Sequence, residues 1–112
     1  MQVFKFGGAS VKDPDSVKNV CSIVRQFAKE PTVVVVSAMG KTTNKLEELV
    51  NAYFYRKDNV NEILAELKNY HFDILKQLFP DPKANIYDDI ENVFVEMIWG
   101  LEEEPSFSTY FL

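Results

Sequence analysis

The chain has 112 residues, the size of one domain at most. Its 17 acidic and 12 basic residues give a net charge of −5. That balance argues against a protein that binds nucleic acid by neutralising phosphates. Hydrophobic residues make up 46% and charged residues 26% of the sequence, close to globular averages, so a disordered chain is not expected.

No membrane or secretory segment is visible. The longest strongly apolar run, Val33–Val36, is far too short to cross a bilayer. Near the N-terminus, Lys5 is followed by Gly7 and Gly8 where a secretory signal would have an apolar stretch. The single cysteine, Cys21, excludes an internal disulfide and a cysteine-based zinc site. We therefore expect a soluble cytoplasmic protein with neither a membrane nor a nucleic acid as partner.

The first two predicted elements are a strand and a helix. Gln2–Phe6 is short and alternating and ends at two glycines, which is typical of a strand. Asp13 and Pro14 predict a helix start, with Asp as the N-cap and Pro in the first turn. Pro31 ends this helix, because the residue before a proline is disfavoured in α conformation. Its predicted buried stripe, which makes Cys21 a small core residue, is Val17, Val20, Cys21, Val24, Phe27 and Ala28.

A second strand is predicted over Thr32–Val36. It is β-branched and apolar on both alternating faces, which is typical of a parallel strand covered on both sides. Strand, helix and strand in this order form a βαβ unit. A helix follows from Thr43 or Asn44, where Asn44 and Glu47 resemble a capping box.

Two more helices are predicted from apolar positions three and four apart, over residues 64–78 and 86–101. Pro80 and Pro82 break the first of them. His71, the only histidine, lies on the apolar stripe of its helix with no ligand-spaced partner, so we expect a packed residue rather than a metal ligand. No metal site is predicted.

The predicted elements do not form a self-sufficient sheet. Two strands offer too little area to bury a strand that is apolar on both faces. The chain also ends in an apolar stretch, whereas natural ends are usually polar: Phe107, Tyr110, Phe111 and Leu112. We therefore expect the N-terminal piece of a larger fold, with a small complete α+β domain as the alternative.

The first candidate for chemistry is Lys5–Ser10 (KFGGAS), at the carboxyl end of the first strand. Ligands of open α/β sheets bind at that end. Two glycines let the backbone approach a phosphate closely, and a lysine adds a positive charge that can follow a transferring phosphoryl group. The alternative is an ordinary strand-to-helix turn.

The second candidate is Ser37–Asn44 (SAMGKTTN), after the second strand and at the start of a helix. Hydroxyl and N–H groups at a helix N-terminus suit an anion, although capping alone explains the same residues. Gly40, Lys41 and Thr42 look like the end of a Walker A loop, but Val35 stands where that motif requires glycine.

Taken together, the two segments resemble aspartate kinases. Lys5–Val11 is similar to the KFGG[TS]SV signature of that family, and Val34–Leu46 is similar to its VVVSAMGxTTN segment. Ala9 is a mild departure, since Thr is commoner there. The resemblance implies an α/β fold, the N-terminal part of the three-layer αβα amino-acid-kinase (carbamate-kinase-like) fold. Residues 1–50 would hold the βαβ unit and both loops, and residues 51–112 a mostly helical segment.

The resemblance also implies an activity, which is transfer of the ATP γ-phosphoryl group to the β-carboxylate of L-aspartate, with Mg²⁺. This reaction gives 4-phospho-L-aspartate on the route to lysine, threonine and methionine. By resemblance, Lys5 neutralises the transferring phosphoryl group. Gly7 and Gly8, with Ser10, hold the ATP phosphates, and Ser37 lies by the phosphate path.

Thr43, again by resemblance, contacts the aspartate. The family's later Gly-Glu motif, substrate-binding arginine, nucleotide-base segment and ACT regulatory domains have no counterpart in this chain. We therefore expect no kinase activity from the chain alone, and a homodimer for the full-length parent, either monofunctional or fused to homoserine dehydrogenase.

Two other functions remain open. One is another amino-acid kinase, acting on glutamate, acetylglutamate, carbamate or uridylate, although the segment Ser37–Asn44 favours aspartate kinases. The other is a non-catalytic interaction module, for which the aromatic residues Tyr53, Phe54 and Tyr55 offer a partner surface.

Overall fold

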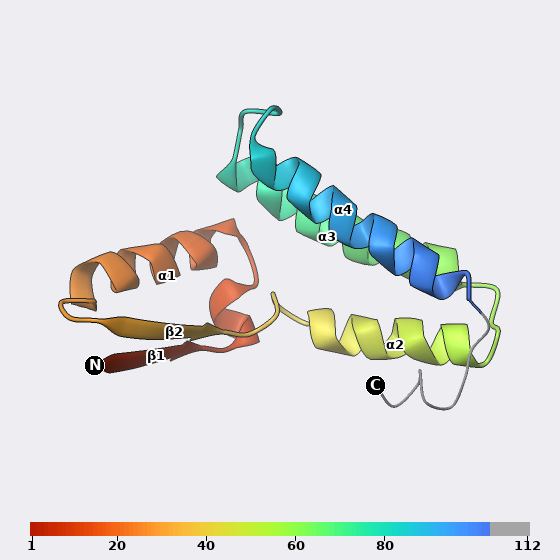
Figure 1. Cartoon of the computed structure of the whole chain (residues 1–112), viewed down its shortest axis with the longest axis horizontal. Coiled ribbons are helices and arrows are strands. Elements are labelled where there is room, and N and C mark those ends of the chain that lie inside the picture. Colours follow the sequence, from red (N-terminus) through yellow and green to blue (C-terminus); the bar gives the residue numbers. More distant parts are fainter. Residues whose placement is uncertain (104–112) are drawn as a thin grey trace. The chain divides into compact units, whose positions relative to one another are not determined.

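The structure is a computed structural model, of which residues 1–103 are described (Figure 1). The chain divides into two compact units, residues 1–43 and residues 44 onward. The apolar C-terminal residues singled out above, Phe107 to Leu112, lie outside the described part.

The first unit contains β1 (Gln2–Phe6), the 3₁₀ turn η1 (Gly8–Val11), α1 (Pro14–Phe27) and β2 (Thr32–Val36). β1 and β2 form a two-stranded parallel sheet, in which Gln2 pairs with Thr32 and Phe6 with Val36. Both predicted strands are confirmed with the predicted bounds.

Helix α1 begins as predicted. The Asp13 carboxylate accepts a hydrogen bond of 2.8 Å from the Ser16 N–H, and Pro14 occupies the first turn. This hydrogen bond lowers the pKa of Asp13 below its ordinary value, because it stabilises the charged form.

The apolar stripe of α1 is less covered than predicted. No residue of α1 is buried, and Cys21 is exposed, so the prediction that Cys21 is a core residue is wrong. The sheet is too narrow to cover this helix, because two strands lie only about 4.8 Å apart whereas a helix with its side chains is about 10 Å across.

The side chains of strand β2 are also more exposed than those of a buried strand. Its four valines, Val33 to Val36, are between 39% and 52% exposed, so neither face of the strand is buried. The sequence predicts a two-sided apolar strand and also predicts that two strands cannot bury it; the structure agrees on both counts among the described residues.

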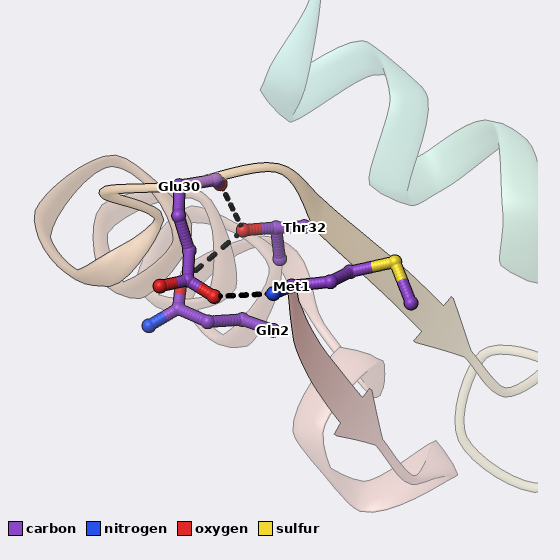
Figure 2. Close-up of polar contacts among 4 residues, drawn as sticks. All are labelled: Met1, Gln2, Glu30 and Thr32. Carbon is purple, nitrogen blue, oxygen red and sulfur yellow. Dashed lines mark hydrogen bonds and ion pairs between the residues drawn. The ribbon is translucent and has the colours of Figure 1, made fainter.

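Polar contacts close the end of the sheet where both strands begin (Figure 2). The Met1 ammonium lies 2.8 Å from a Glu30 carboxylate oxygen. The Thr32 hydroxyl lies 2.7 Å from the Glu30 carbonyl oxygen and 3.2 Å from Gln2 Oε1. The Gln2 N–H donates to the Pro31 carbonyl at 3.0 Å. The opposite end of the sheet carries the candidate loops.

The second unit is helical and contains most of α2 (Thr42–Phe54), together with α3 (Val60–Leu78) and α4 (Asn85–Leu101). All three helices are predicted from the sequence. Helix α2 begins at Thr42, so Asn44 lies inside the helix and the predicted capping box at Asn44 and Glu47 is wrong.

Apolar residues from all three helices build one core in this unit: Leu49, Ala52, Ile63, Leu64, Leu67 and Phe94. His71 is half-buried, its Nδ1 lies 2.9 Å from the Leu67 carbonyl oxygen and its ring packs against Phe94, which confirms the prediction of a packed histidine.

Ion pairs join neighbouring helices of the same unit. Lys45 on α2 pairs with Glu66 on α3, and Lys68 on α3 lies 2.5 Å from Glu91 on α4. The hydrogen bond to Glu66 raises the pKa of Lys45. Among residues 1–103, no helix is long and apolar enough to cross a membrane.

Candidate functional site

The site lies where the two parallel strands end. Parallel strands bring their carboxyl ends to one edge of a sheet, and ligands of open α/β sheets bind outside that edge. The Ser37 N–H donates to the Phe6 carbonyl at 2.9 Å, which extends the ladder by one residue past β2. The two segments that leave the sheet, residues 7–10 (the first loop) and residues 37–41 (the second loop), therefore start side by side.

A backbone contact joins the two loops further along. The Gly40 N–H donates to the Gly8 carbonyl at 3.0 Å. A Cβ atom on Gly8 would lie 2.6 Å from the Gly40 carbonyl oxygen and 3.2 Å from that of Ala38. Position 8 therefore needs glycine because the second loop packs directly against its backbone.

Packing against neighbouring atoms does not explain why position 7 is a glycine. Its backbone is extended, with φ −78° and ψ 175°, which any residue adopts. A Cβ atom placed there meets nothing within 4 Å. The backbone of the first loop thus borders open space at Gly7, and a missing side chain leaves room for a ligand to approach closely. Ser10 follows, with its N–H donating to the Gly7 carbonyl at 3.0 Å.

Lys5 stands on β1, opposite Val35 in the sheet register and two residues before Gly7. It lies on the more exposed side of the strand, together with Val3. Its ammonium forms no ion pair with any residue that the structure describes. A positive charge next to the loop edge is therefore available to an anionic ligand.

The remaining predicted site residues lie on the second loop and on the first turn of α2. Ser37 is exposed and directly follows β2, and Thr43 is the exposed second residue of α2. All six predicted residues thus belong to the first unit, on β1 or at the carboxyl edge of its sheet: Lys5, Gly7, Gly8, Ser10, Ser37 and Thr43.

Two further residues shape the second loop and are absent from that prediction. Gly40 has φ 55°, in the left-handed region that favours glycine. Thr42 is only 8% exposed and donates its hydroxyl to the Met39 carbonyl at 2.5 Å. Gly40 inside a polar segment is the sequence signal that could have indicated the turn. Nothing in the sequence indicates that Thr42 is buried while its neighbour Thr43 is exposed.

Charge is divided unequally between the two units. Residues 1–43 hold six Lys and Arg against three Asp and Glu, a net charge of +3. Residues 44–112 hold six against fourteen, a net charge of −8. The unit with the glycine loops therefore carries the charge that attracts an anion, even though the whole chain is acidic.

No metal centre is built by these residues. Among the described residues, no group of three or more histidine, cysteine or acidic side chains is arranged to hold a metal ion. The two loops themselves contain no acidic residue; their polar groups are hydroxyls, Lys41 and the backbone.

Comparison with known proteins decides the family. The family model described as the amino acid kinase family matches residues 1–91. The chain belongs to the amino acid kinase family. The observed strand, helix, strand and helix order fits an N-terminal part of that fold, so the predicted fold class is confirmed.

The curated relatives are aspartokinases. The chain is 38% identical over 86 residues to Aspartokinase 1, chloroplastic, of Arabidopsis thaliana, covering 73% of this chain and 15% of the relative. It is 38% identical over 76 residues to Aspartokinase of Chlamydia muridarum, covering 68% and 16%. With Bifunctional aspartokinase/homoserine dehydrogenase 2 of Escherichia coli it shares 29% identity over 94 residues, covering 84% and 11%. The alignments thus span most of this chain but only 11–16% of the length of these relatives.

Proposed function

We propose that the chain is the N-terminal part of an aspartate kinase catalytic domain. The reaction is transfer of the γ-phosphoryl group of ATP to the β-carboxylate of L-aspartate, giving 4-phospho-L-aspartate for lysine, threonine and methionine synthesis. Two aspartokinases with 38% identity over about 70% of the chain support aspartate over glutamate, acetylglutamate, carbamate or uridylate as acceptor.

One observation carries the proposal, which is the open space at Gly7 in the first loop. The hydrogen bond from the Gly40 N–H to the Gly8 carbonyl holds this loop in place. Phosphoryl transfer needs positioning and charge neutralisation rather than covalent chemistry from the protein. The open backbone at Gly7, in a loop fixed by a hydrogen bond, can position the phosphates. Lys5, on the strand that leads into this loop, can neutralise their charge.

These positions support the roles that the resemblance to aspartate kinases implies. Lys5 neutralises the transferring phosphoryl group, and the backbone of Gly7 and Gly8 with Ser10 holds the ATP phosphates. Ser37 follows β2 at the same edge, beside the phosphate path. Thr43, at the start of α2, contacts the aspartate.

Mg²⁺ enters as part of the nucleotide substrate in this proposal. The two loops supply no carboxylate, so their hydroxyls and amides bind phosphate oxygens, while the cation travels with ATP. Mg²⁺ bound with ATP would supply further neutralisation of the charge that develops during transfer.

In this proposal, the other catalytic residues belong to a part of the parent protein outside these 112 residues. Residues 1–50 supply the βαβ unit with both loops, residues 51–112 supply a helical segment, and the nucleotide base and regulatory ligands bind elsewhere in a homodimeric parent. The support is that the chain spans 15% and 16% of two aspartokinases. We place the protein in the cytoplasm, with a plastid as the alternative that the Arabidopsis relative's name suggests.

Hydroxylamine trapping of acyl phosphate tests the function. The 112-residue chain and the full product of its gene are each incubated with ATP, Mg²⁺ and L-aspartate, with L-glutamate as the matched acceptor. We expect aspartate-dependent hydroxamate from the full product and none from the chain alone. A signal with glutamate in place of aspartate would contradict the substrate, and full turnover by the chain alone would contradict the partial site.

A further inference from the structure

Thr42 stands out because its buried hydroxyl bonds backwards into the second loop. Among residues 1–103 it is the one buried polar side chain. The Met39 carbonyl accepts two hydrogen bonds from Thr42, from the hydroxyl at 2.5 Å and from the N–H at 3.1 Å. These two bonds close a turn from Met39 to Thr42 that contains Gly40 with its positive φ.

This arrangement differs from helix capping. A capping side chain accepts a hydrogen bond from an N–H group of the first helical turn. The Thr42 hydroxyl instead donates, and its acceptor is a loop carbonyl outside α2. The hydroxyl therefore supports the shape of the second loop rather than the start of the helix.

The second loop in turn holds the first. Gly40 lies inside the turn that Thr42 closes, and its N–H donates to the Gly8 carbonyl at 3.0 Å. The Gly40 carbonyl oxygen fills the place where a side chain at Gly8 would begin, 2.6 Å from an ideal Cβ. A change in the turn at Gly40 must therefore move the backbone of Gly8, to which the proposed function assigns the ATP phosphates.

We propose that Thr42 is a positioning residue for phosphoryl transfer, acting through Met39 and Gly40 on the backbone of Gly8. The inference rests on the proposed kinase function. It assigns Thr42 no contact with substrate, in contrast to its exposed neighbour Thr43. Because small misplacements of reacting groups cost large factors in rate, loss of the hydroxyl reduces kcat by about tenfold or more.

The test uses three variants of the full gene product in the hydroxylamine assay. Thr42→Val removes the hydroxyl and keeps the shape of the side chain, and Thr42→Ser keeps the hydroxyl. Thr32→Val is the matched control, since the Thr32 hydroxyl also lies 2.7 Å from a backbone carbonyl oxygen but at the opposite end of β2 (Figure 2). For each variant, kcat, the KM values for ATP and aspartate, and the thermal unfolding midpoint are measured.

We expect Thr42→Val to lose about tenfold or more in kcat, Thr42→Ser to recover most of it, and Thr32→Val to stay within about twofold of the wild type. A purely structural role predicts that Thr42→Val lowers only the unfolding midpoint and leaves kcat and both KM values unchanged, an outcome that overturns the proposal. If the wild type gives no aspartate-dependent product, the proposed function fails and the role of Thr42 fails with it.

A second measurement tests the proposal if the Thr42→Val variant does not fold. Amide hydrogen exchange of Gly40 is then compared in the full gene product among wild type, Thr42→Ser and Thr42→Ala, of which only Thr42→Ala lacks the hydroxyl. We expect Gly40 to exchange at least about tenfold faster in Thr42→Ala only, because the free energy of opening its hydrogen bond falls. Equal exchange in all three chains overturns the proposal.

Discussion

The two units of this chain are held together in different ways. In residues 1–43 only Val11 and Thr42 are buried, and the two loops that follow the strands are joined by a backbone hydrogen bond from Gly40 to Gly8. The helical unit instead has a contiguous apolar core that includes Leu49, Leu67 and Phe94. The loops proposed to bind phosphate therefore depend on backbone geometry, whereas the helices depend on apolar burial.

The largest expected effect lies in the helical core. Phe94 is 4% exposed and packs against the rings of His71 and Phe72. Phe94→Ala should lower the free energy of unfolding of the helical unit by about 3–5 kcal/mol, because it removes apolar burial and leaves a cavity. Denaturant unfolding followed by helical circular dichroism measures this loss.

The neighbouring residue Val93 provides the control for that change. Val93 lies on the same helix and is 50% exposed, so Val93→Ala should cost less than about 1 kcal/mol. Equal losses at Val93 and Phe94 would mean that the core of the helical unit is not where the structure places it.

A smaller effect is expected where the two loops meet. Gly8→Ala forces a Cβ to within 2.6 Å of the Gly40 carbonyl oxygen, so the loops must separate at a cost of about 1–3 kcal/mol. Gly7→Ala meets open space at an ordinary φ and should leave stability unchanged or raise it by up to about 1 kcal/mol. Residue-resolved amide exchange in the first unit compares the two variants.

The same pair also separates stability from binding. Under the proposed function, Gly7→Ala should weaken ATP binding by the full gene product without destabilising the first unit, because its Cβ occupies the space left for phosphate. Unchanged ATP affinity in a well-folded Gly7→Ala protein would remove the main support for a phosphate site at this loop.

The smallest effect is a pH dependence at the start of α1. The pKa of Asp13 is lowered in the folded protein by the hydrogen bond from Ser16, so the unfolded state binds the proton more tightly. This contribution is complete above the ordinary value of 3.8 and is lost as the pH falls through the lower folded value. Asp13→Asn, which keeps an acceptor without a titrating charge, should therefore differ from wild type at neutral pH more than in acid.

Thermal unfolding between pH 2 and pH 7 measures this difference. A gap between wild type and Asp13→Asn that stays constant across the range would show that the charge on Asp13 does not contribute. The ion pair of Lys45 and Glu66 lies in the other unit and is common to both proteins, so it does not disturb the comparison.

Local features were predictable where the signal is local. The bounds of β1 follow from a short alternating run that ends at glycine, and those of β2 from a β-branched run that ends at serine. The start of α1 follows from Asp13 and Pro14. The position of Lys5 and of the two loops at one sheet edge follows from the general rule for parallel strands. The motif resemblance then pointed to the kinase family, which the family match to residues 1–91 supports.

Features that depend on neighbours were not predictable. Cys21 belongs to an apolar stripe, but its burial depends on how wide a sheet α1 meets. Asn44 has capping chemistry, yet the turn at Gly40 starts the helix at Thr42, so Asn44 is already inside it. Thr42 and Thr43 are identical in sequence terms, and only the fold buries one and exposes the other.

The sequence by itself determined the order of strands and helices, the helix cap at Asp13 and the membership of the amino acid kinase family, because each is written in residue type and spacing. The tertiary structure decided which glycine serves packing and which leaves space: Gly8 meets the Gly40 carbonyl, and Gly7 meets nothing within 4 Å. Two adjacent glycines are chemically the same, and only the path of a segment some 30 residues away distinguishes them.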